Sequence, residues 1–206
     1  MDIQKVVVIG SGTMGTGIAA QVANAGIPVT LLDLPSKEGS RNSITENAKD
    51  KIIKSRPPLL FEKNKIDFIS AGNIEDDFQQ VSEADWIVEA VVERIDVKHD
   101  IYKKIKKIRK KDSIISSNTS TIPLKILSNK MSIDMKKNFC ITHFFNPVRY
   151  MGLLEIVIEK INDKQKIDIL KTFCDEKLGK GVIICNDTPG FIGNRVGVYA
   201  MQVAIT

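Results

Sequence analysis

A histidine and a glutamate on two neighbouring expected strands could carry out acid–base chemistry. His143 lies in an apolar strand expected over 138–144, and Glu155 follows twelve residues later in a strand expected over 153–158. A connection of that length lets two strands place an imidazole beside a carboxylate. The carboxylate would fix the tautomer and stabilise the imidazolium, while the other ring nitrogen takes a proton from an alcohol. The alternative is a packed core histidine, because many His–Glu neighbours are structural.

A glycine-rich turn near the start of the chain could cradle a pyrophosphate. Residues 10–15 read G-x-G-x-x-G (Gly10, Gly12 and Gly15) between an apolar strand expected over 3–9 and an apolar helix expected over 13–25. The glycines permit a tight turn and a close approach of the backbone, and the helix start supplies N–H groups and a positive dipole end. Such a turn without a ligand is the alternative, but the strand–turn–helix setting favours the binding site.

The carboxylate of Asp33 ends a second strand, expected over 27–33. At this position a carboxylate can accept hydrogen bonds from a ribose 2′-OH and would repel a 2′-phosphate. The pattern therefore favours NAD over NADP.

Six consecutive small polar residues close another expected strand, over 113–117. They occupy residues 116–121, and the carboxyl ends of strands in such a sheet are where ligands bind. Hydroxyl groups there could bind substrate or cofactor. A capped turn before the next helix is an equally good interpretation on composition alone.

The elements that must position these residues alternate between strands and helices. The remaining expected elements are a polar helix over 39–54, a break at Pro57-Pro58, a strand over 66–70, a turn at Gly72-Asn73, a strand over 85–92, a helix over 96–110, helices over 123–129 and 163–178, and a strand over 182–185. This alternation predicts an α/β fold with a Rossmann-type, doubly wound, mostly parallel sheet. We expect residues 1–186 to form the NAD-binding domain.

Residues 187–195 look like a turn that opens a new helix over 196–205, which is apolar along much of its length. Such a helix needs something to cover it. It either packs back on the first domain or is the start of an incomplete, helical C-terminal domain over 187–206. We expect the second arrangement.

Composition narrows the class of protein. The chain has 206 residues, of which 43% are hydrophobic and 27% charged, and it holds no apolar run of the length that spans a membrane. Because the first strand begins almost at Met1, we expect no signal peptide and a cytoplasmic location. The cysteines (Cys140, Cys174 and Cys185) lack metal-ligand spacing and are expected to be buried thiols. The only histidines are His99 and His143, which excludes a His-rich metal site.

Much of the net charge of +5 lies in the basic stretch 103–111. Nucleic-acid binding is one interpretation of such a stretch. However, Ile101, Ile105 and Ile108 recur at helical spacing, so we expect an amphipathic helix with a lysine-covered outer face. A preference for a polyanionic ligand such as coenzyme A stays open.

Several motifs along the chain together resemble a known family. They are Gly10-Ser11-Gly12-Thr13-Met14-Gly15, Val91-Val92-Glu93, Ser117-Asn118-Thr119-Ser120, His143-Phe144-Phe145-Asn146-Pro147, Leu154-Glu155 and Asp187-Thr188-Pro189-Gly190-Phe191. In this order they resemble the NAD-binding domain of L-3-hydroxyacyl-CoA dehydrogenases. Residues 120–123 and 138–140 are similar in particular to the versions in bacterial multifunctional fatty-acid oxidation proteins.

The resemblance implies NAD-dependent, reversible oxidation of an L-3-hydroxyacyl-CoA to a 3-oxoacyl-CoA in fatty-acid beta-oxidation. It makes His143 the base and Glu155 its partner, and it places Ser120 and Asn194 at the 3-oxygen or the thioester side of the substrate. The residues that it places at the cofactor are Gly10, Gly12, Thr13, Met14, Gly15, Asp33, Val92, Glu93, Lys98, Ser120 and Asn146. It implies an acyl-CoA substrate, no metal or nucleic acid, and a homodimer or a fusion partner in the full-length protein.

The local sequence alone gives plainer interpretations of three of these residues. Glu93 would be a strand-end carboxylate, Lys98 a solvated helix lysine and Asn146 part of an ordinary Asn-Pro turn. Two other functions also compete. A β-hydroxyacid dehydrogenase typically uses a catalytic lysine, which the His143–Glu155 pair argues against. A non-catalytic NAD-binding module derived from the enzyme is supported by the incompleteness of the expected helical domain. The presence of His143, Glu155, Ser120 and Asn194 weighs against it.

Overall fold

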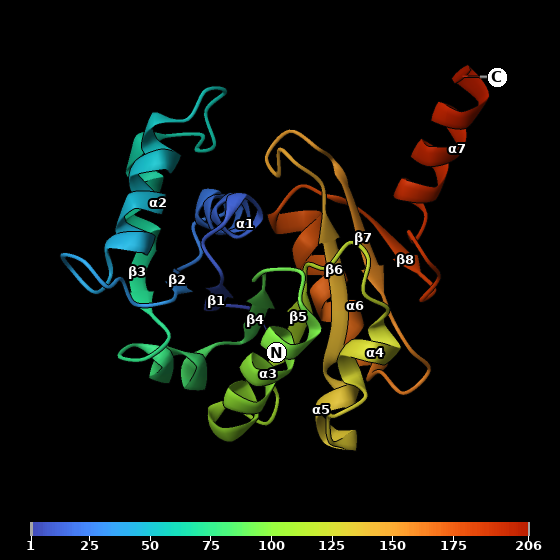
Figure 1. The fold of residues 1–206 in the computed structure, drawn as a ribbon, viewed down its shortest axis with the longest axis horizontal. Coiled ribbons are helices and arrows are strands. Elements are labelled where there is room, and N and C mark those ends of the chain that lie inside the picture. The colour runs from blue at the N-terminus through green and yellow to red at the C-terminus, as the bar shows by residue number, and fades with distance from the viewer. Residues whose placement is uncertain (1, 206) are drawn as a thin grey trace.

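The computed structural model describes residues 2–205, which form an eight-stranded sheet with the order β3-β2-β1-β4-β5-β6-β7-β8 (Figure 1). The strands are β1 (Val6–Ile9), β2 (Val29–Asp33), β3 (Ile69–Asn73), β4 (Trp86–Glu89), β5 (Ile114–Ser117), β6 (Phe139–Phe144), β7 (Leu153–Val157) and β8 (Gly181–Cys185). Strands β1 to β6 are parallel, whereas β7 is antiparallel to β6 and parallel to β8. The expected Rossmann-type α/β fold is confirmed.

The connections between the strands are mostly helical. The α-helices are α1 (Thr13–Asn24), α2 (Ser43–Lys54), α3 (Ile95–Ile108), α4 (Leu124–Ser128), α5 (Ile133–Lys137), α6 (Lys164–Thr172) and α7 (Gly193–Ile205), with 3-10 segments η1 (Lys63–Phe68) and η2 (Phe78–Glu83) and a π-helical segment η3 (Phe173–Lys177). Figure 1 shows α1 and α3 on opposite faces of the sheet.

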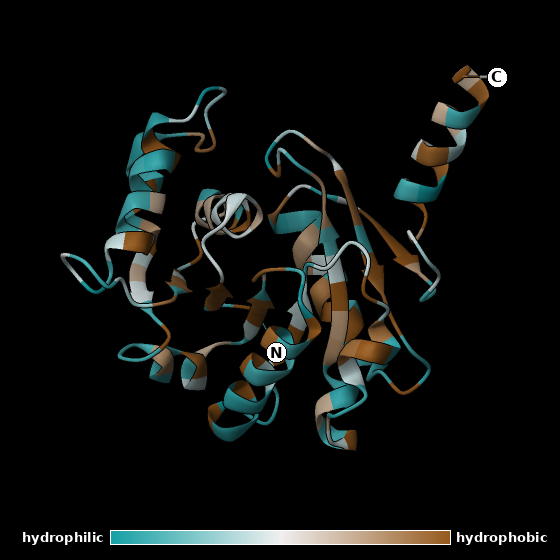
Figure 2. Ribbon diagram, in the orientation of Figure 1, coloured by the Kyte–Doolittle hydropathy of each residue, from teal (hydrophilic) through white to brown (hydrophobic). Residues whose placement is uncertain are grey.

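The strand period of two separates the core into two layers. Val6 and Val8 of β1 pack in one apolar cluster with residues of α1, α2 and α6. Val7 and Ile9 point to the other face and join residues of α3 and α4. Both faces are therefore covered, which explains why the central strands are continuous apolar runs, as Figure 2 shows by their brown colour.

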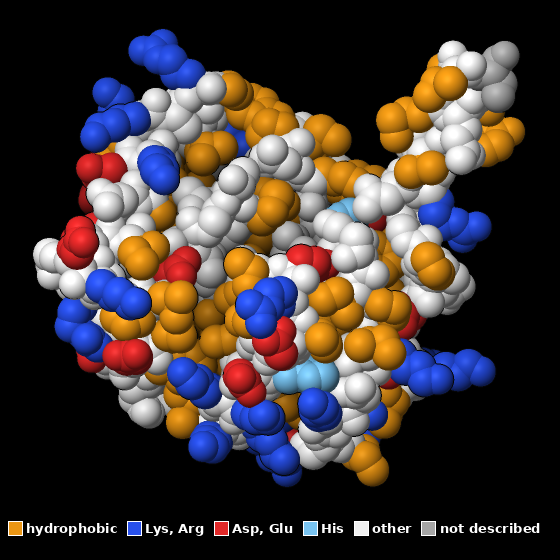
Figure 3. Space-filling view, in the orientation of Figure 1, with side chains coloured by type: hydrophobic (Ala, Val, Ile, Leu, Met, Phe, Trp, Pro, Cys, Tyr) orange, Lys and Arg blue, Asp and Glu red, His pale blue; other side chains and the backbone are white. Residues whose placement is uncertain are grey.

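The basic stretch forms the amphipathic helix that its spacing predicts. Ile101 and Ile105 of α3 are buried in the core, whereas residues 103, 104, 106 and 107 are exposed lysines. Figure 3 shows Lys and Arg side chains gathered over this part of the surface. Burial of one face with lysines on the other is the expected solvated arrangement. The three cysteines are buried free thiols, as expected.

The expected turn at Gly72-Asn73 is wrong, and one short helix was not expected. Gly72 and Asn73 do not form a turn, because they pair with Leu32 and Asp33 as the last residues of β3. A side chain at Gly72 would meet Asp77 atoms 2.8 Å away, so the close approach of Asp77 explains this glycine. The helix α5 lies in a stretch with no expected element, because five residues are too few to show a helical period.

The helix α7 contains no buried residue and extends away from the sheet (Figure 1). Its large apolar side chains are exposed, with Val196 at 62% and Tyr199 at 69%, and Figure 3 shows hydrophobic side chains around it. The helix thus does not pack back on the sheet; a role as the start of a second domain stays a prediction. Within residues 2–205, no helix combines the length and the hydrophobicity needed to cross a membrane.

Candidate functional site

His143 and Glu155 lie directly opposite each other on β6 and β7, where they are register partners in the antiparallel pair. Their side chains form a hydrogen bond of 2.7 Å between Nδ1 and Oε2. His143 is 3% exposed and Glu155 is 0% exposed. The expected placement of an imidazole beside a carboxylate is therefore correct.

The second carboxylate oxygen of Glu155 binds the beginning of α7. Oε1 accepts the backbone N–H groups of Ile192 at 2.8 Å and Gly193 at 2.7 Å. Because an ionised carboxylate can only accept hydrogen bonds, we assign the donated proton of this pair to Nδ1 of His143. Nε2 then carries a lone pair, which can accept a hydrogen bond or a proton.

Ser120 completes a linear series of side chains that ends at this nitrogen. Its hydroxyl lies 3.0 Å from Nε2 of His143, at the loop that follows β5. The imidazole also packs between two aromatic rings, with ring centres 4.5 Å from Phe145 and 5.5 Å from Phe191. His143 is thus a packed core residue and also part of a polar series. Asn194 follows Gly193 in the first turn of α7 and is half-buried.

A pocket of about 510 Å³ opens beside the glycine-rich turn. Its lining residues are Ile9, Gly10, Gly12, Thr13, Met14, Asp33, Leu34, Ile74, Ala90, Val91, Val92, Val97, Asp100, Ile101 and Lys104. Six of the residues expected at the cofactor line it: Gly10, Gly12, Thr13, Met14, Asp33 and Val92. The pocket lies at the carboxyl ends of the strands, where ligands bind in folds of this class.

The three positions of the turn require glycine for different physical reasons. A side chain at Gly10 would meet the carbonyl oxygen of Ala90 at 2.4 Å, and one at Gly15 would meet the carbonyl oxygen of Gly10 at 1.8 Å. A side chain at Gly12 would meet no atom of the described chain within 4 Å. Gly10 and Gly15 are required by the fold, whereas Gly12 leaves open space in the pocket wall where a pyrophosphate can approach.

The carboxylate of Asp33 shapes the turn and faces the same pocket. Its Oδ2 accepts the backbone N–H of Ser11 at 2.5 Å and the hydroxyl of Ser11 at 2.6 Å, while Oδ1 accepts the N–H of Leu34 at 2.7 Å. Each carboxylate oxygen has two acceptor positions, so a ribose hydroxyl can still donate to Oδ1. The residues present therefore fit NAD.

A pair of glycine substitutions separates these roles. Gly12→Ala should change the free energy of unfolding by less than about 0.5 kcal/mol and weaken NADH binding by about tenfold or more, because its methyl group fills the approach to the pyrophosphate. Gly15→Ala should lower the stability by about 3 kcal/mol or more, because the clash is with backbone. Urea unfolding and NADH fluorescence titration measure both effects. Unchanged NADH affinity in Gly12→Ala would place the cofactor elsewhere.

Lys98 is a buried residue, so its interpretation as a solvated helix lysine is wrong. It is 1% exposed, and its Nζ lies 2.7 Å from Glu89 Oε1 and 3.2 Å from Glu93 Oε2. Glu93 binds the small polar loop after β5, accepting the hydroxyl of Thr119 and the N–H of Ser120. Burial opposes ionisation of Glu93, but the Thr119 hydroxyl and the Lys98 ammonium outweigh it and lower its pKa.

Sequence reasoning missed Glu89, which is 0% exposed at the end of β4. The signal was a carboxylate inside the otherwise apolar run 86–92, since a buried carboxylate needs partners. Asn146, expected at the cofactor, lies exposed in the loop between β6 and β7. The structure does not bring Gly15, Glu93, Lys98, Ser120 or Asn146 into the lining of the 510 Å³ pocket, and their cofactor contacts stay predictions.

The chain is similar to proteins of one enzyme family. A family model described as "3-hydroxyacyl-CoA dehydrogenase, NAD binding domain" matches residues 5–188. A probable 3-hydroxyacyl-CoA dehydrogenase of Deinococcus radiodurans is 44% identical over 100% of this chain and 60% of its own length. A putative fatty acid oxidation complex trifunctional enzyme of Rickettsia felis is 45% identical over 98% of this chain and 28% of its own length.

A solved structure agrees with these sequence matches. The (S)-3-hydroxybutyryl-CoA dehydrogenase of Ralstonia eutropha superposes with a TM-score of 0.82 at 29% identity, over 98% of this chain and 70% of its own. The chain spans 60% of the length of the Deinococcus relative and 28% of the length of the Rickettsia relative. The cofactor of the matched domain is NAD, in agreement with the open space at Gly12 and the position of Asp33. On the match over residues 5–188, the chain belongs to the 3-hydroxyacyl-CoA dehydrogenase family and contains its NAD-binding domain.

Proposed function

We propose that the chain supplies the NAD-binding half of an active site that reversibly oxidises an L-3-hydroxyacyl-CoA to a 3-oxoacyl-CoA. The observation that carries this proposal is the series Ser120–His143–Glu155, with links of 3.0 Å and 2.7 Å. It provides one base, His143, whose Nε2 faces the hydroxyl group of Ser120. A substrate hydroxyl would bind at this position. The names of the Deinococcus and Ralstonia proteins support the substrate class.

The nicotinamide supplies the hydride acceptor when NAD is bound. The lone pair of His143 Nε2 accepts the proton of the substrate hydroxyl, and the charge of the resulting imidazolium is stabilised by Glu155 through the 2.7 Å hydrogen bond. In the reverse direction the imidazolium protonates the forming alkoxide. Ser120 occupies Nε2 at 3.0 Å, so its hydroxyl must turn to the substrate oxygen when the substrate binds.

The aromatic surroundings favour this role. Phe145 and Phe191 enclose the imidazole and limit the access of water. A low local dielectric strengthens the His143–Glu155 interaction once the imidazole is charged. The pair can thus move a proton with little rearrangement, because both side chains are already placed by paired strands.

The wider setting is also part of the proposal. Fatty-acid beta-oxidation and fusion to other enzyme domains are supported by the name of the Rickettsia relative. Residues 1–186 would be the NAD-binding domain, and residues 187–206, with α7, the start of a helical domain. Further elements of that domain would cover the exposed Val196 and Tyr199 of α7. In this second domain Asn194 would contact the substrate. Homodimer formation and a cytoplasmic location stay predictions.

The purified chain should bind NADH and reduce acetoacetyl-CoA, because the pocket and the base are both present. NADH binding is measured by fluorescence titration, and turnover by the loss of NADH absorbance. A parallel assay adds the remaining segment of the Deinococcus relative in trans, since the chain spans 60% of that protein. NADH binding without turnover in both assays would contradict the enzyme and favour the second candidate, a non-catalytic NAD-binding module. Turnover only with the added segment would show that the active site needs the second domain.

A further inference from the structure

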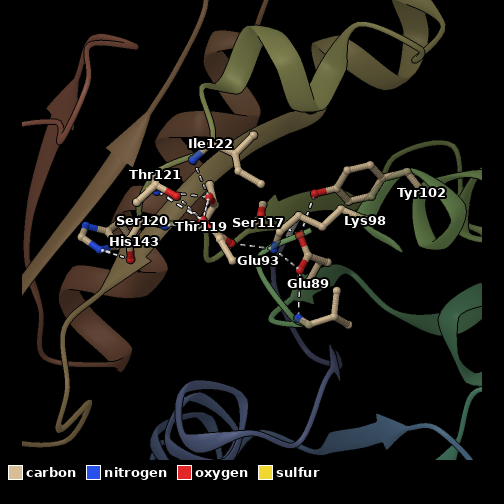
Figure 4. A network of polar contacts seen from close by, with 11 residues as sticks. Glu89, Glu93, Lys98, Tyr102, Ser117, Thr119, Ser120, Thr121, Ile122 and His143 are labelled. Atoms are coloured by element: carbon tan, nitrogen blue, oxygen red, sulfur yellow. Dashed lines mark hydrogen bonds and ion pairs between the residues drawn. The ribbon is translucent and has the colours of Figure 1, made fainter. Parts of the chain in front are cut away.

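A series of three charged side chains, two of them buried, links β4 and α3 to the loop that carries Ser120 (Figure 4). Glu89 is 0% exposed and Lys98 is 1% exposed. The Lys98 ammonium lies between the two carboxylates, 2.7 Å from Glu89 and 3.2 Å from Glu93. The first carboxylate is in the core, and the side chain of the second is 40% exposed. None of these groups takes part in the proton transfer proposed above.

The carboxylate of Glu89 accepts four hydrogen bonds, two on each oxygen atom. Oε1 accepts the Lys98 ammonium at 2.7 Å and the N–H of Val91 at 2.9 Å. Oε2 accepts the hydroxyls of Tyr102 and Ser117, each at 2.6 Å. Four donors fill the acceptor positions of one ionised carboxylate. A charge that is bound this completely can remain buried next to the ammonium.

The carboxylate of Glu93 collects the donors of the loop. Its Oε1 accepts the hydroxyl of Thr119, the backbone N–H groups of Ser120 and Thr121 at 3.2 Å each, and the hydroxyl of Thr121 at 3.0 Å. One oxygen atom therefore organises three consecutive residues. The middle residue, Ser120, places its hydroxyl 3.0 Å from His143.

The position of Glu93 depends in turn on Lys98. One carboxylate oxygen is held by the loop and the other by the ammonium, so the side chain is fixed from two sides. Without Glu89, the ammonium would be buried with one partner instead of two, which is costly. It would then move toward Glu93 and solvent, and the carboxylate would move with it.

We propose that Glu89 is a positioning residue of the dehydrogenase site: it holds Lys98, which holds Glu93, which fixes Ser120 against His143. The proposal rests on the proposed function, because the value of an ordered Ser120 lies in the proton transfer at His143. The order of the loop is itself measurable without cofactor or substrate. Glu89 acts through Lys98 and Glu93 and would contact neither the cofactor nor the substrate.

The decisive variant is Glu89→Gln, compared with Tyr102→Phe as a matched control. Glutamine has nearly the same size but replaces one acceptor oxygen by a donor and removes the charge that binds Lys98. Tyr102→Phe removes one hydrogen bond from the same carboxylate and leaves the ion pair intact. Both variants lose buried hydrogen bonding, but only the first one loosens Lys98.

The main readout is amide hydrogen exchange of the apo chain, because the N–H groups of Ser120 and Thr121 donate to Glu93. Their exchange should become about tenfold faster in Glu89→Gln than in Tyr102→Phe, after correction for global stability. The ¹⁵N signal of His143 Nε2 should shift in Glu89→Gln, because its hydrogen bond to Ser120 weakens. His99 is the only other histidine, so His99→Gln assigns the signals.

The kinetic readout uses acetoacetyl-CoA and NADH with the same variants. If wild type is active, kcat should fall about 10- to 100-fold in Glu89→Gln, the loss expected for a displaced active-site group. Unchanged loop exchange and an unchanged ¹⁵N signal in Glu89→Gln would overturn the proposal. Faster loop exchange in Glu89→Gln, together with a wild type that lacks turnover, would support the positioning and contradict only the proposed function.

A second variant covers the case in which Glu89→Gln does not fold. Glu89→Gln combined with Lys98→Met removes both buried charges and leaves no unpaired one, an exchange that is often nearly neutral for stability. Glu93 then lacks its ammonium partner, so the amides of Ser120 and Thr121 should again exchange about tenfold faster. A folded double variant with wild-type exchange in this loop would overturn the proposal.

Discussion

His143→Asn should lower kcat for acetoacetyl-CoA reduction by about 10²- to 10⁴-fold, the usual contribution of a general acid–base residue. Asparagine keeps a polar group that can bind Glu155, but it offers no nitrogen that takes up a proton near neutral pH. Because His143 does not line the pocket beside the glycine-rich turn, NADH affinity should change by less than about threefold. Fluorescence titration and steady-state kinetics measure the two effects separately.

The matched control for this prediction is His99→Gln. His99 is also buried, at 6% exposure, and its Nε2 lies 3.3 Å from the carbonyl oxygen of Ile126. Its loss removes a buried imidazole without affecting the series Ser120–His143–Glu155. We expect His99→Gln to retain kcat. An equal loss in both variants would attribute the effect to folding, and a retained kcat in His143→Asn would exclude His143 as the base.

Glu155→Gln should also lower kcat strongly, by about 10³- to 10⁴-fold, the size expected when an imidazole is held in the wrong tautomer. The carboxylate accepts hydrogen bonds on both oxygens, from His143 on one and from Ile192 and Gly193 on the other. Glutamine has one acceptor oxygen and one amino group. If its amino group faces His143, the ring proton must move to Nε2, which then cannot act as a base.

The opposite orientation of glutamine damages a different contact. Its amino group would face the N–H groups of Ile192 and Gly193, so the first turn of α7 would lose two hydrogen bonds. Unsatisfied buried donors cost about 1 to 3 kcal/mol each. We therefore expect Glu155→Gln to lower stability as well as activity, which urea unfolding measures.

The tautomer can be read directly from the ¹⁵N signals of His143 in Glu155→Gln. Protonation on Nε2 is expected in the variant, and protonation on Nδ1 in the wild type. Glu159→Gln is a suitable control because Glu159 lies two residues beyond the end of β7 (Leu153–Val157), and it should keep both the tautomer and kcat. A wild-type tautomer with full activity in Glu155→Gln would refute the role of the carboxylate.

The double use of Glu155 connects the base to the beginning of α7. One oxygen fixes His143 and the other binds N–H groups at the point where α7 leaves the sheet. Gly193 belongs to the same contact, because a side chain there would meet the ring of Phe145 at 2.7 Å. The chain that follows β8 therefore takes part in shaping the histidine site.

Much of the fold and part of the site could be predicted from the sequence, because they depend on local patterns. Apolar runs followed by helical periods gave the parallel sheet, and G-x-G-x-x-G with Asp33 gave the cofactor. His143 and Glu155 are twelve residues apart on adjacent strands, so the connection itself pairs them. The short helix α5 and the extension of β3 through Asn73 were not predictable, because neither shows a distinct period.

The remaining contacts are between residues far apart in the chain, and only the tertiary structure determined them. Ser120 and His143 are 23 residues apart, and Glu155 and Gly193 are 38 residues apart. Their approach depends on how strand ends and loops pack together, which spacing does not encode. Lys98 is another example. The lysine-rich sequence of α3 predicts a solvated side chain at this position, whereas the structure places the Lys98 ammonium between two carboxylates. The sequence by itself determined the strand–turn–helix that binds NAD and the His143–Glu155 pair, because short-range geometry fixes both; the tertiary structure decided which hydroxyl, amides and charges surround them.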